Sequence, residues 1–283
     1  AYYPHPKSCI YKLNSSFLIW LVLLTGAVAW IWWRIPVAVA PGDGGFKGYL
    51  LLHQLVYLLF VLTPLLAVLI TEKWRLKQII RQYRLTLCGI DVKKAVFYSV
   101  FTAIAFPVLI VVLVLFFANV LGVSGAGKIV PQSWTTLLIA FVWAITVGWL
   151  GALPGEIAWR GFLEHNVTVT RFGKYFFIGL VWGVWNLPVV AFVAAGQSMG
   201  ERIAYMGCVL LMCVICSFYY ASALHRTRTL FVPALLQGLI FSSLAFYTIG
   251  GGDIFWNGRF GVLGCLGVLI IYGITHAWSR KRQ

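Results

Sequence analysis

The sequence predicts an all-α fold, a polytopic membrane helix bundle of about eight transmembrane helices. Three observations lead to it. Of 283 residues, 61% are hydrophobic and only 10% are charged, and the mean hydropathy is +0.90. The apolar residues fall into eight separate runs, and the basic residues gather between alternate runs. A soluble domain could not cover this much apolar area with so few charges, whereas a bilayer solvates apolar side chains and helices satisfy their own backbone groups.

Each predicted span is an apolar run close to the roughly 20 residues needed to cross a bilayer. Prolines are expected to kink three of these helices, at Pro107, Pro188 and Pro233. The runs are Phe17–Trp33, Tyr49–Ile70, Ala95–Leu121, Trp134–Leu153, Tyr175–Gly196, Ile203–Leu224, Thr229–Ile249 and Gly261–Ala277.

The distribution of Lys and Arg predicts the orientation. With the N-terminus inside, the inner segments hold sixteen basic residues and the outer segments five, apart from Arg160 within a motif. Because basic residues favour the cytoplasmic side, an N-in, C-in topology follows. The net charge of +15 is therefore a feature of topology rather than of nucleic-acid binding.

The longest polar stretch, residues 71–94, carries seven basic residues against Glu72 and Asp91. We expect it to form a basic interfacial helix on anionic lipid headgroups at the cytoplasmic surface, with a specific partner site as the alternative. The whole chain, 1–283, is expected to be a single membrane domain. The first apolar run ends in Trp32, Trp33 and Arg34 rather than small residues, so it is expected to be a retained helix, and the predicted location is the bacterial inner membrane.

Ionisable and amide side chains inside spans are expensive, so each needs a reason. Glu156 and Arg160 lie four residues apart and would share one helix face, where they can form a structural ion pair. Asn186 lies in the fifth run and Gln237 in the seventh. Taken singly, such amides serve most often as interhelical hydrogen-bonding groups.

Three ordered segments resemble the CAAX protease and bacteriocin-processing (CPBP) family of intramembrane proteases. The resemblance covers about residues 134–245. The segments are Pro154-Gly155-Glu156-Ile157-Ala158-Trp159-Arg160-Gly161-Phe162-Leu163, Trp182-Gly183-Val184-Trp185-Asn186-Leu187-Pro188 and Thr227 to Gly238, which includes Pro233-Ala234. The family patterns that they resemble are Glu-Glu-x-x-x-Arg with Gly-Phe-Leu, an aromatic residue followed four positions later by His, and His-x-x-x-Asn.

The residues that would carry the family's chemistry are replaced. The first glutamate, taken in the family to activate water, is Gly155 here, although Glu156 and Arg160 are retained. Trp182 takes the aromatic place of the second motif. The two histidines and the asparagine are replaced by the residues Asn186, Gln237 and Phe241. Gly155 has an additional packing interpretation, because Gly151-x-x-x-Gly155 is a pattern that permits close helix contact.

This set is poorly suited to peptide hydrolysis. Hydrolysis needs a base and an oxyanion donor, and a catalytic zinc needs about three protein ligands. Asn and Gln amides cannot act as bases near neutral pH, and Glu156 is expected to be tied to Arg160. We therefore expect no intact catalytic residues, no metal site and no cofactor. The six cysteines are interpreted as small buried hydrophobes.

The leading functional hypothesis is a non-catalytic, CPBP-like pseudoprotease that binds or scaffolds a partner membrane protein or peptide, within a larger membrane complex and without nucleic acid. One alternative is an active CAAX-type endopeptidase with atypical residues, which would require His53 or His165 to enter the site. A second alternative is a lipid-binding or small-molecule-binding membrane protein.

Overall fold

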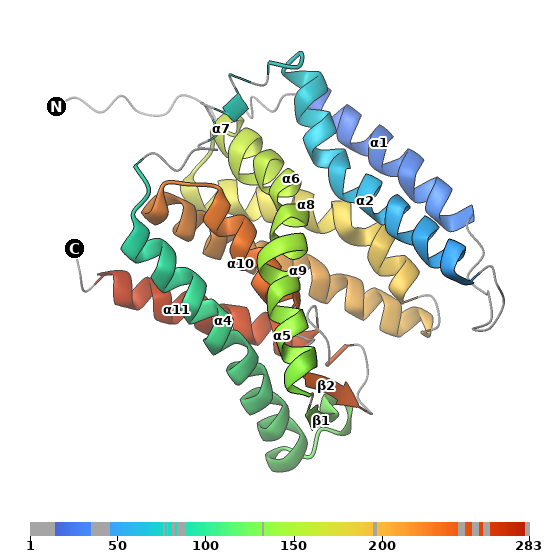
Figure 1. The fold of residues 1–283 in the computed structure, drawn as a ribbon, viewed down its shortest axis with the longest axis vertical. Coiled ribbons are helices and arrows are strands. Elements are labelled where there is room, and N and C mark those ends of the chain that lie inside the picture. Colours follow the sequence, from blue (N-terminus) through green and yellow to red (C-terminus); the bar gives the residue numbers. More distant parts are fainter. Residues whose placement is uncertain are drawn as a thin grey trace.

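The structure is a computed structural model of the chain. It describes residues 15–34, 46–75, 77, 79–80, 83, 89–131, 133–194, 197–242, 247–250, 255–256 and 261–280. The described residues are almost all helical, and one two-stranded antiparallel ribbon accompanies the helices. The prediction of an all-α bundle is therefore confirmed (Figure 1).

The helices are α1 (Ser15–Arg34), α2 (Phe46–Thr71), α4 (Val92–Leu115), α5 (Trp134–Trp143), α6 (Trp149–Glu156), α7 (Glu164–Asn166), α8 (Arg171–Val193), α9 (Met199–Thr227), α10 (Phe231–Ser242) and α11 (Val262–Arg280). The strands are β1 (Lys128–Pro131) and β2 (Tyr247–Gly250). Short π-helical segments at Phe116–Val120, Ala144–Gly148 and Ile157–Leu163 continue α4, α5 and α6, and a 3-10 turn covers Ser124–Ala126.

Within the described residues, six helical segments are long and apolar enough to cross a membrane. The chain is therefore an integral membrane protein. The segments are Ser15–Arg34, Leu52–Thr71, Val92–Val120, Trp134–Asn166, Arg171–Phe192 and Met199–Thr227, and the apolar helices Phe231–Phe241 and Val262–Trp278 are shorter.

The prediction that the seventh run, Thr229–Ile249, forms a single helix is wrong. Its helical part, α10, ends at Ser242, and Tyr247–Gly250 forms β2 instead. Twelve helical residues rise about 18 Å, which is less than the roughly 30 Å hydrocarbon core. The predicted kink at Pro233 is also wrong. Because α10 begins at Phe231, this proline lies in the first turn, where a missing N–H breaks no helical hydrogen bond.

Helices α8 and α9 make the most extensive helix contact, and two glycines of α8 bring their backbones together. An added Cβ at Gly179 would lie 2.5 Å from Val214 Cα, and one at Gly183 would lie 2.8 Å from Leu210 Cδ2. By contrast, a Cβ at Gly151 would meet nothing within 4 Å. The close helix contact expected from the Gly151-x-x-x-Gly155 pattern is therefore wrong, and the small-residue pattern that builds an interface lies on α8.

Two connections fix where the ends of α10 lie. The Asp91 backbone N–H donates to Thr227 O at 3.2 Å, so the end of α9 lies beside the start of α4. Beyond α10, β2 pairs antiparallel with β1, which follows the far end of α4 (Figure 1). The two ends of the segment that contains α10 therefore lie near opposite ends of α4.

The predicted interfacial helix at 71–94 falls partly outside the described residues. After α2, Lys73 and Trp74 adopt positive φ, which ends the helix. Helical hydrogen bonds then link Ile79 N to Arg75 O and Tyr83 N to Ile79 O. Lys77, Ile79 and Ile80 are helical, and contact with lipid headgroups stays a prediction.

Candidate functional site

The first motif lies inside one long helical segment, Trp134–Asn166. Within it, Ile157–Leu163 forms a π-helical segment, and all seven of these residues are buried. Single π-helical turns inside α-helices are rare and are frequent at functional sites. The long segment Trp134–Asn166 runs along the front of the bundle in Figure 1, and α8 and α9 lie behind α6.

The predicted ion pair is confirmed. Arg160 Nη1 donates to Glu156 Oε1 at 2.8 Å, and the two side chains are 1% and 0% exposed. A charge this deeply buried is tolerated only when it is paired, because desolvation costs several kcal/mol per ion. The four-residue spacing on one helix supplies that pairing.

Two aromatic rings hold the guanidinium of Arg160. Its Cζ lies 4.7 Å from the ring centroid of Trp182 on α8 and 5.1 Å from that of Tyr220 on α9. Cation–π contacts of this kind contribute about 2 kcal/mol each when desolvated. The arginine therefore joins three helical segments that are separate in sequence.

Trp182 also connects the second motif to the third. Asn186 Nδ2 donates to Trp182 O at 2.9 Å, one turn back along α8, and lies 3.8 Å from Cys213 Sγ. The Phe241 ring centroid on α10 is 6.5 Å from that of Trp182. Trp182 thus contacts Arg160, Asn186 and Phe241.

Gln237 lies one helical turn before Phe241 on α10 and is buried. Its Oε1 finds no hydrogen-bond partner among the described residues, and the same holds for Glu156 Oε2. The next residue, Gly238, packs tightly on the motif helix, since its added Cβ would lie 2.6 Å from Ala144 O. Gln237 is thus held on a helix anchored to the motif segment, without a described contact to the ion pair.

At Gly155, which the motif resemblance aligns with a glutamate, the side-chain space is crowded by an aromatic ring. An added Cβ there would lie 3.0 Å from Trp159 Nε1, and Trp159 is fully buried. The Trp159 ring in turn packs on Trp185 at 5.7 Å between centroids. Trp159 and Tyr220 are thus structural members of the site that the motif comparison did not single out. An apolar run rich in tyrosine and tryptophan gives no local signal of which ring will face an arginine.

Three histidines lie in other contacts. His53 Nδ1 accepts from Trp32 Nε1 at 3.0 Å, and the His165 ring lies 6.2 Å from that of Tyr83. His225 Nε2 lies 2.8 Å from Glu164 Oε1, and the Tyr175 hydroxyl lies 2.6 Å from the same nitrogen. None of these contacts joins a histidine to Glu156. In the described part of the chain, no group of three or more His, Cys, Asp or Glu side chains is arranged to hold a metal ion.

The Tyr83 hydroxyl, outside the spans, donates to Glu72 Oε1 at 3.2 Å. Burial, reinforced by the charge of Glu72, raises the pKa of this hydroxyl well above its ordinary range. Tyr83 also presses on the motif segment, because an added Cβ at Gly161 would lie 3.0 Å from Tyr83 Cβ. Tyr83, within the 71–94 segment, is therefore packed against the candidate site.

No protein-family model matches this chain, and no curated protein matches it.

Proposed function

We propose that this protein is a non-catalytic, CPBP-like intramembrane pseudoprotease that acts as a membrane subunit and binds or scaffolds a partner membrane protein or peptide. The observation that carries the proposal is that Glu156, the one carboxylate retained in the motif, is already bound in an ion pair. Glu156 is paired with Arg160, whose guanidinium lies between Trp182 and Tyr220. A glutamate held in this way acts as a structural counter-ion rather than as a base for water.

The neighbouring side chains support the same conclusion. Gly155 has no carboxylate to offer, and its side-chain space borders the Trp159 indole. Asn186 donates its amide hydrogen to its own helix. Peptide hydrolysis requires a base that takes a proton from water and donors for the oxyanion, and loss of each costs about two to four orders of magnitude in rate.

A partner requires exposed surface, and α5 offers it. Trp134, Leu138 and Ile139 are 87%, 64% and 67% exposed. This apolar face precedes the motif on the same long helical segment, so a partner bound there would lie in line with the buried pair. Retention of a fold after loss of chemistry fits a binding role, because fold does not fix function.

The proposal includes eight crossings with both termini inside a bacterial cytoplasmic membrane. The pairing of β2 with β1 supports a seventh crossing at α10, although α10 is short, because the segment starts beside Asp91 and ends beside Lys128. The 19 residues of α11 rise about 28 Å, close to a full crossing. The bias of basic residues toward the inner segments supports the orientation.

An active CAAX-type endopeptidase is the second candidate. It is favoured by Glu156 Oε2, which has no hydrogen-bond partner among the described residues and could accept a proton from water. The two candidates differ in what the unaltered chain does: an endopeptidase cleaves its substrate, whereas a scaffold binds its partner without cleaving it.

The test uses three full-length proteins reconstituted in vesicles: the unaltered chain, Glu156→Gln, and a chain with the family pattern restored. The restored residues are introduced by Gly155→Glu, Asn186→His, Gln237→His and Phe241→Asn. Each is assayed for cleavage of prenylated and transmembrane peptides. Cleavage by the restored chain alone supports the proposal, and cleavage by the unaltered chain that Glu156→Gln removes would overturn it.

Partner binding is tested separately by photo-crosslinking in native membranes. A photoreactive side chain is placed at Ile139 on α5, and a matched one at Leu269 on α11, which is 50% exposed. We expect one protein to be captured repeatedly from Ile139 and not from Leu269. Capture of lipid alone from both positions would contradict the scaffold role.

A further inference from the structure

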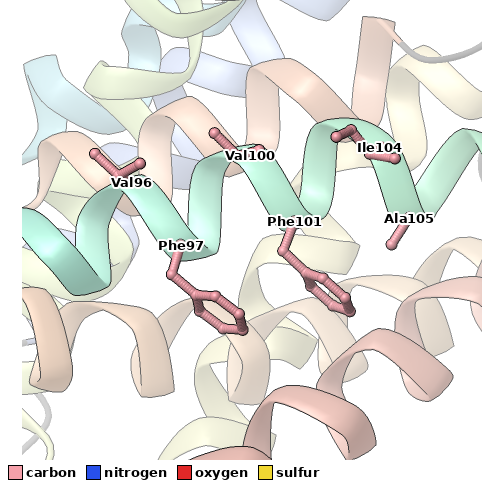
Figure 2. A pocket seen from close by; sticks show the side chains of 6 residues that line it. All are labelled: Val96, Phe97, Val100, Phe101, Ile104 and Ala105. Atoms are coloured by element: carbon pink, nitrogen blue, oxygen red, sulfur yellow. The ribbon is translucent and has the colours of Figure 1, made fainter.

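Two rows of side chains on α4 line an open, apolar groove on the outer surface of the bundle. Val96, Val100 and Ile104 form one row, and Phe97, Phe101 and Ala105 form the other, each at four-residue spacing. The groove has a volume of about 420 Å³ and is open to the surroundings of the bundle. Figure 2 shows Phe97 and Phe101 side by side, pointing to the same side of the helix.

The walls of the groove are differently anchored. Val96, Val100 and Ile104 are more than half exposed, whereas Phe97 and Phe101 pack against the core. Phe97 stacks on Phe101 at 5.5 Å and on Trp278 of α11 at 3.9 Å between centroids. The aromatic wall is therefore fixed by two helices, and the aliphatic wall faces the surroundings of the bundle.

The charged residues near the groove lie at its N-terminal end, at the start of α4. Asp91 and Lys94 form an ion pair at 2.7 Å with both side chains partly exposed, which marks the start of α4 as a polar boundary. Lys93 is exposed, and no hydrogen bond or ion pair to it is recorded within the described residues. It lies three and four residues before Val96 and Phe97, so it shares their helix face.

The dimensions fit one lipid leaflet. From position 96 to 105 the helix rises about 14 Å, close to half of the roughly 30 Å hydrocarbon core. An acyl chain that starts at the headgroup level would cover this length, and a Lys at that level attracts an anionic headgroup.

We propose that this groove binds one acyl chain of an anionic phospholipid whose phosphate is bound by Lys93. The site is distinct from the Glu156–Arg160 pair and does not depend on the pseudoprotease proposal. The same helix contacts α9 through the hydrogen bond between Thr102 and Tyr219 at 2.6 Å.

The test uses the full-length chain in phosphatidylcholine vesicles with a minority of phosphatidylglycerol. A trace of either lipid carries a photoreactive group in its acyl chain, and crosslinked residues are mapped by mass spectrometry. We expect labelling of residues 96–105 by phosphatidylglycerol to exceed that by phosphatidylcholine about fivefold, as one lysine near an anionic surface predicts.

Two variants and two controls complete the test. Lys93→Gln should bring the two lipids to equal labelling, and Val100→Trp should fill the groove and reduce labelling at least severalfold. The first control is Lys128→Gln, an exposed lysine in β1 beyond the far end of α4. The second is Val112→Trp, an exposed α4 position outside the groove. Neither control should change either result. Equal labelling by both lipids in the unaltered chain would overturn the proposal. So would an unlabelled groove with crosslinks to a second copy or another protein, and so would loss of labelling in the controls.

Discussion

The indole Nε1 of Trp159 lies 3.0 Å from the point that a Cβ at Gly155 would occupy. Gly155 is the position that the motif resemblance aligns with a water-activating glutamate. The space that a side chain at this position would enter is therefore not open. A buried ring that also packs on Trp185 borders it.

This contact predicts that Gly155→Ala does not increase the stability of the protein, whereas Gly151→Ala on the same helix does. Alanine is favoured over glycine inside a helix by about 0.5–1 kcal/mol. Gly151 has open space for the methyl group, whereas at Gly155 the methyl must displace a fully buried ring. Thermal unfolding in detergent should show a higher Tm for Gly151→Ala and an unchanged or lower Tm for Gly155→Ala. Equal increases for the two variants would contradict this packing.

Removal of Arg160 is predicted to be far more damaging than removal of Gln237. Arg160→Ala leaves the Glu156 carboxylate buried without its partner and empties the space between Trp182 and Tyr220, a loss of about 3–5 kcal/mol. Gln237→Ala removes an amide whose Oε1 has no hydrogen-bond partner among the described residues, so its cost should not exceed roughly 1 kcal/mol, the value of an interhelical amide hydrogen bond. Yield after solubilisation and Tm measure both.

A double variant separates charge from packing. Glu156→Leu combined with Arg160→Met removes both charges and keeps apolar volume, so it should recover most of the stability that Arg160→Ala loses. If the double variant were as unstable as Arg160→Ala, the pair would not be the source of the loss.

Hydropathy was sufficient to predict the helical membrane fold, because each span carries its own apolar signal. It failed at the seventh run, because the apolar pattern does not mark the end of α10 at Ser242 or the strand at Tyr247–Gly250. Its strand conformation depends on pairing with Lys128–Pro131, more than a hundred residues earlier. The same reason explains why the wrong glycine pair was predicted to form a helix interface. Tertiary packing decides whether Gly151 and Gly155 or Gly179 and Gly183 meet a neighbouring helix.

The Glu156–Arg160 pair was predictable because it lies within one helix, where spacing fixes the geometry. The two aromatic rings that hold the Arg160 guanidinium were not predictable, since Trp182 and Tyr220 come from α8 and α9. The assignment of Gly155, Asn186, Gln237 and Phe241 as altered catalytic positions stays a prediction that rests on the motif resemblance.

The close approach of α8 and α9 predicts a strong effect of Gly179→Ala. Its methyl group would meet Val214 Cα at 2.5 Å, and a backbone atom cannot move aside as a flexible side chain can. Overpacking of this kind costs about 1–3 kcal/mol. Gly207→Ala on α9, where nothing lies within 4 Å, is the matched control and should be neutral or slightly stabilising. A similar Tm for the two variants would argue against the contact.

Asp91 caps α4 outside the membrane. Its Oδ1 accepts from Lys94 N at 3.1 Å, and its Oδ2 lies 2.7 Å from Lys94 Nζ. The side-chain hydrogen bond from Lys94, followed by that from the Lys94 backbone, lowers the pKa of the Asp91 carboxyl below its ordinary value.

A carboxyl whose folded pKa is depressed stabilises the protein above its unfolded pKa of about 3.9, and this contribution disappears as the pH falls through the folded pKa. Asp91→Asn keeps an acceptor for the cap but has no charge to titrate. We therefore expect the unaltered chain to have a slightly higher Tm than Asp91→Asn at pH 7, and this difference to vanish in strong acid. Because the side chains are exposed, added salt should also reduce the difference at pH 7. A Tm difference that stayed constant between pH 7 and strong acid would show that Asp91 contributes only its cap and not its charge.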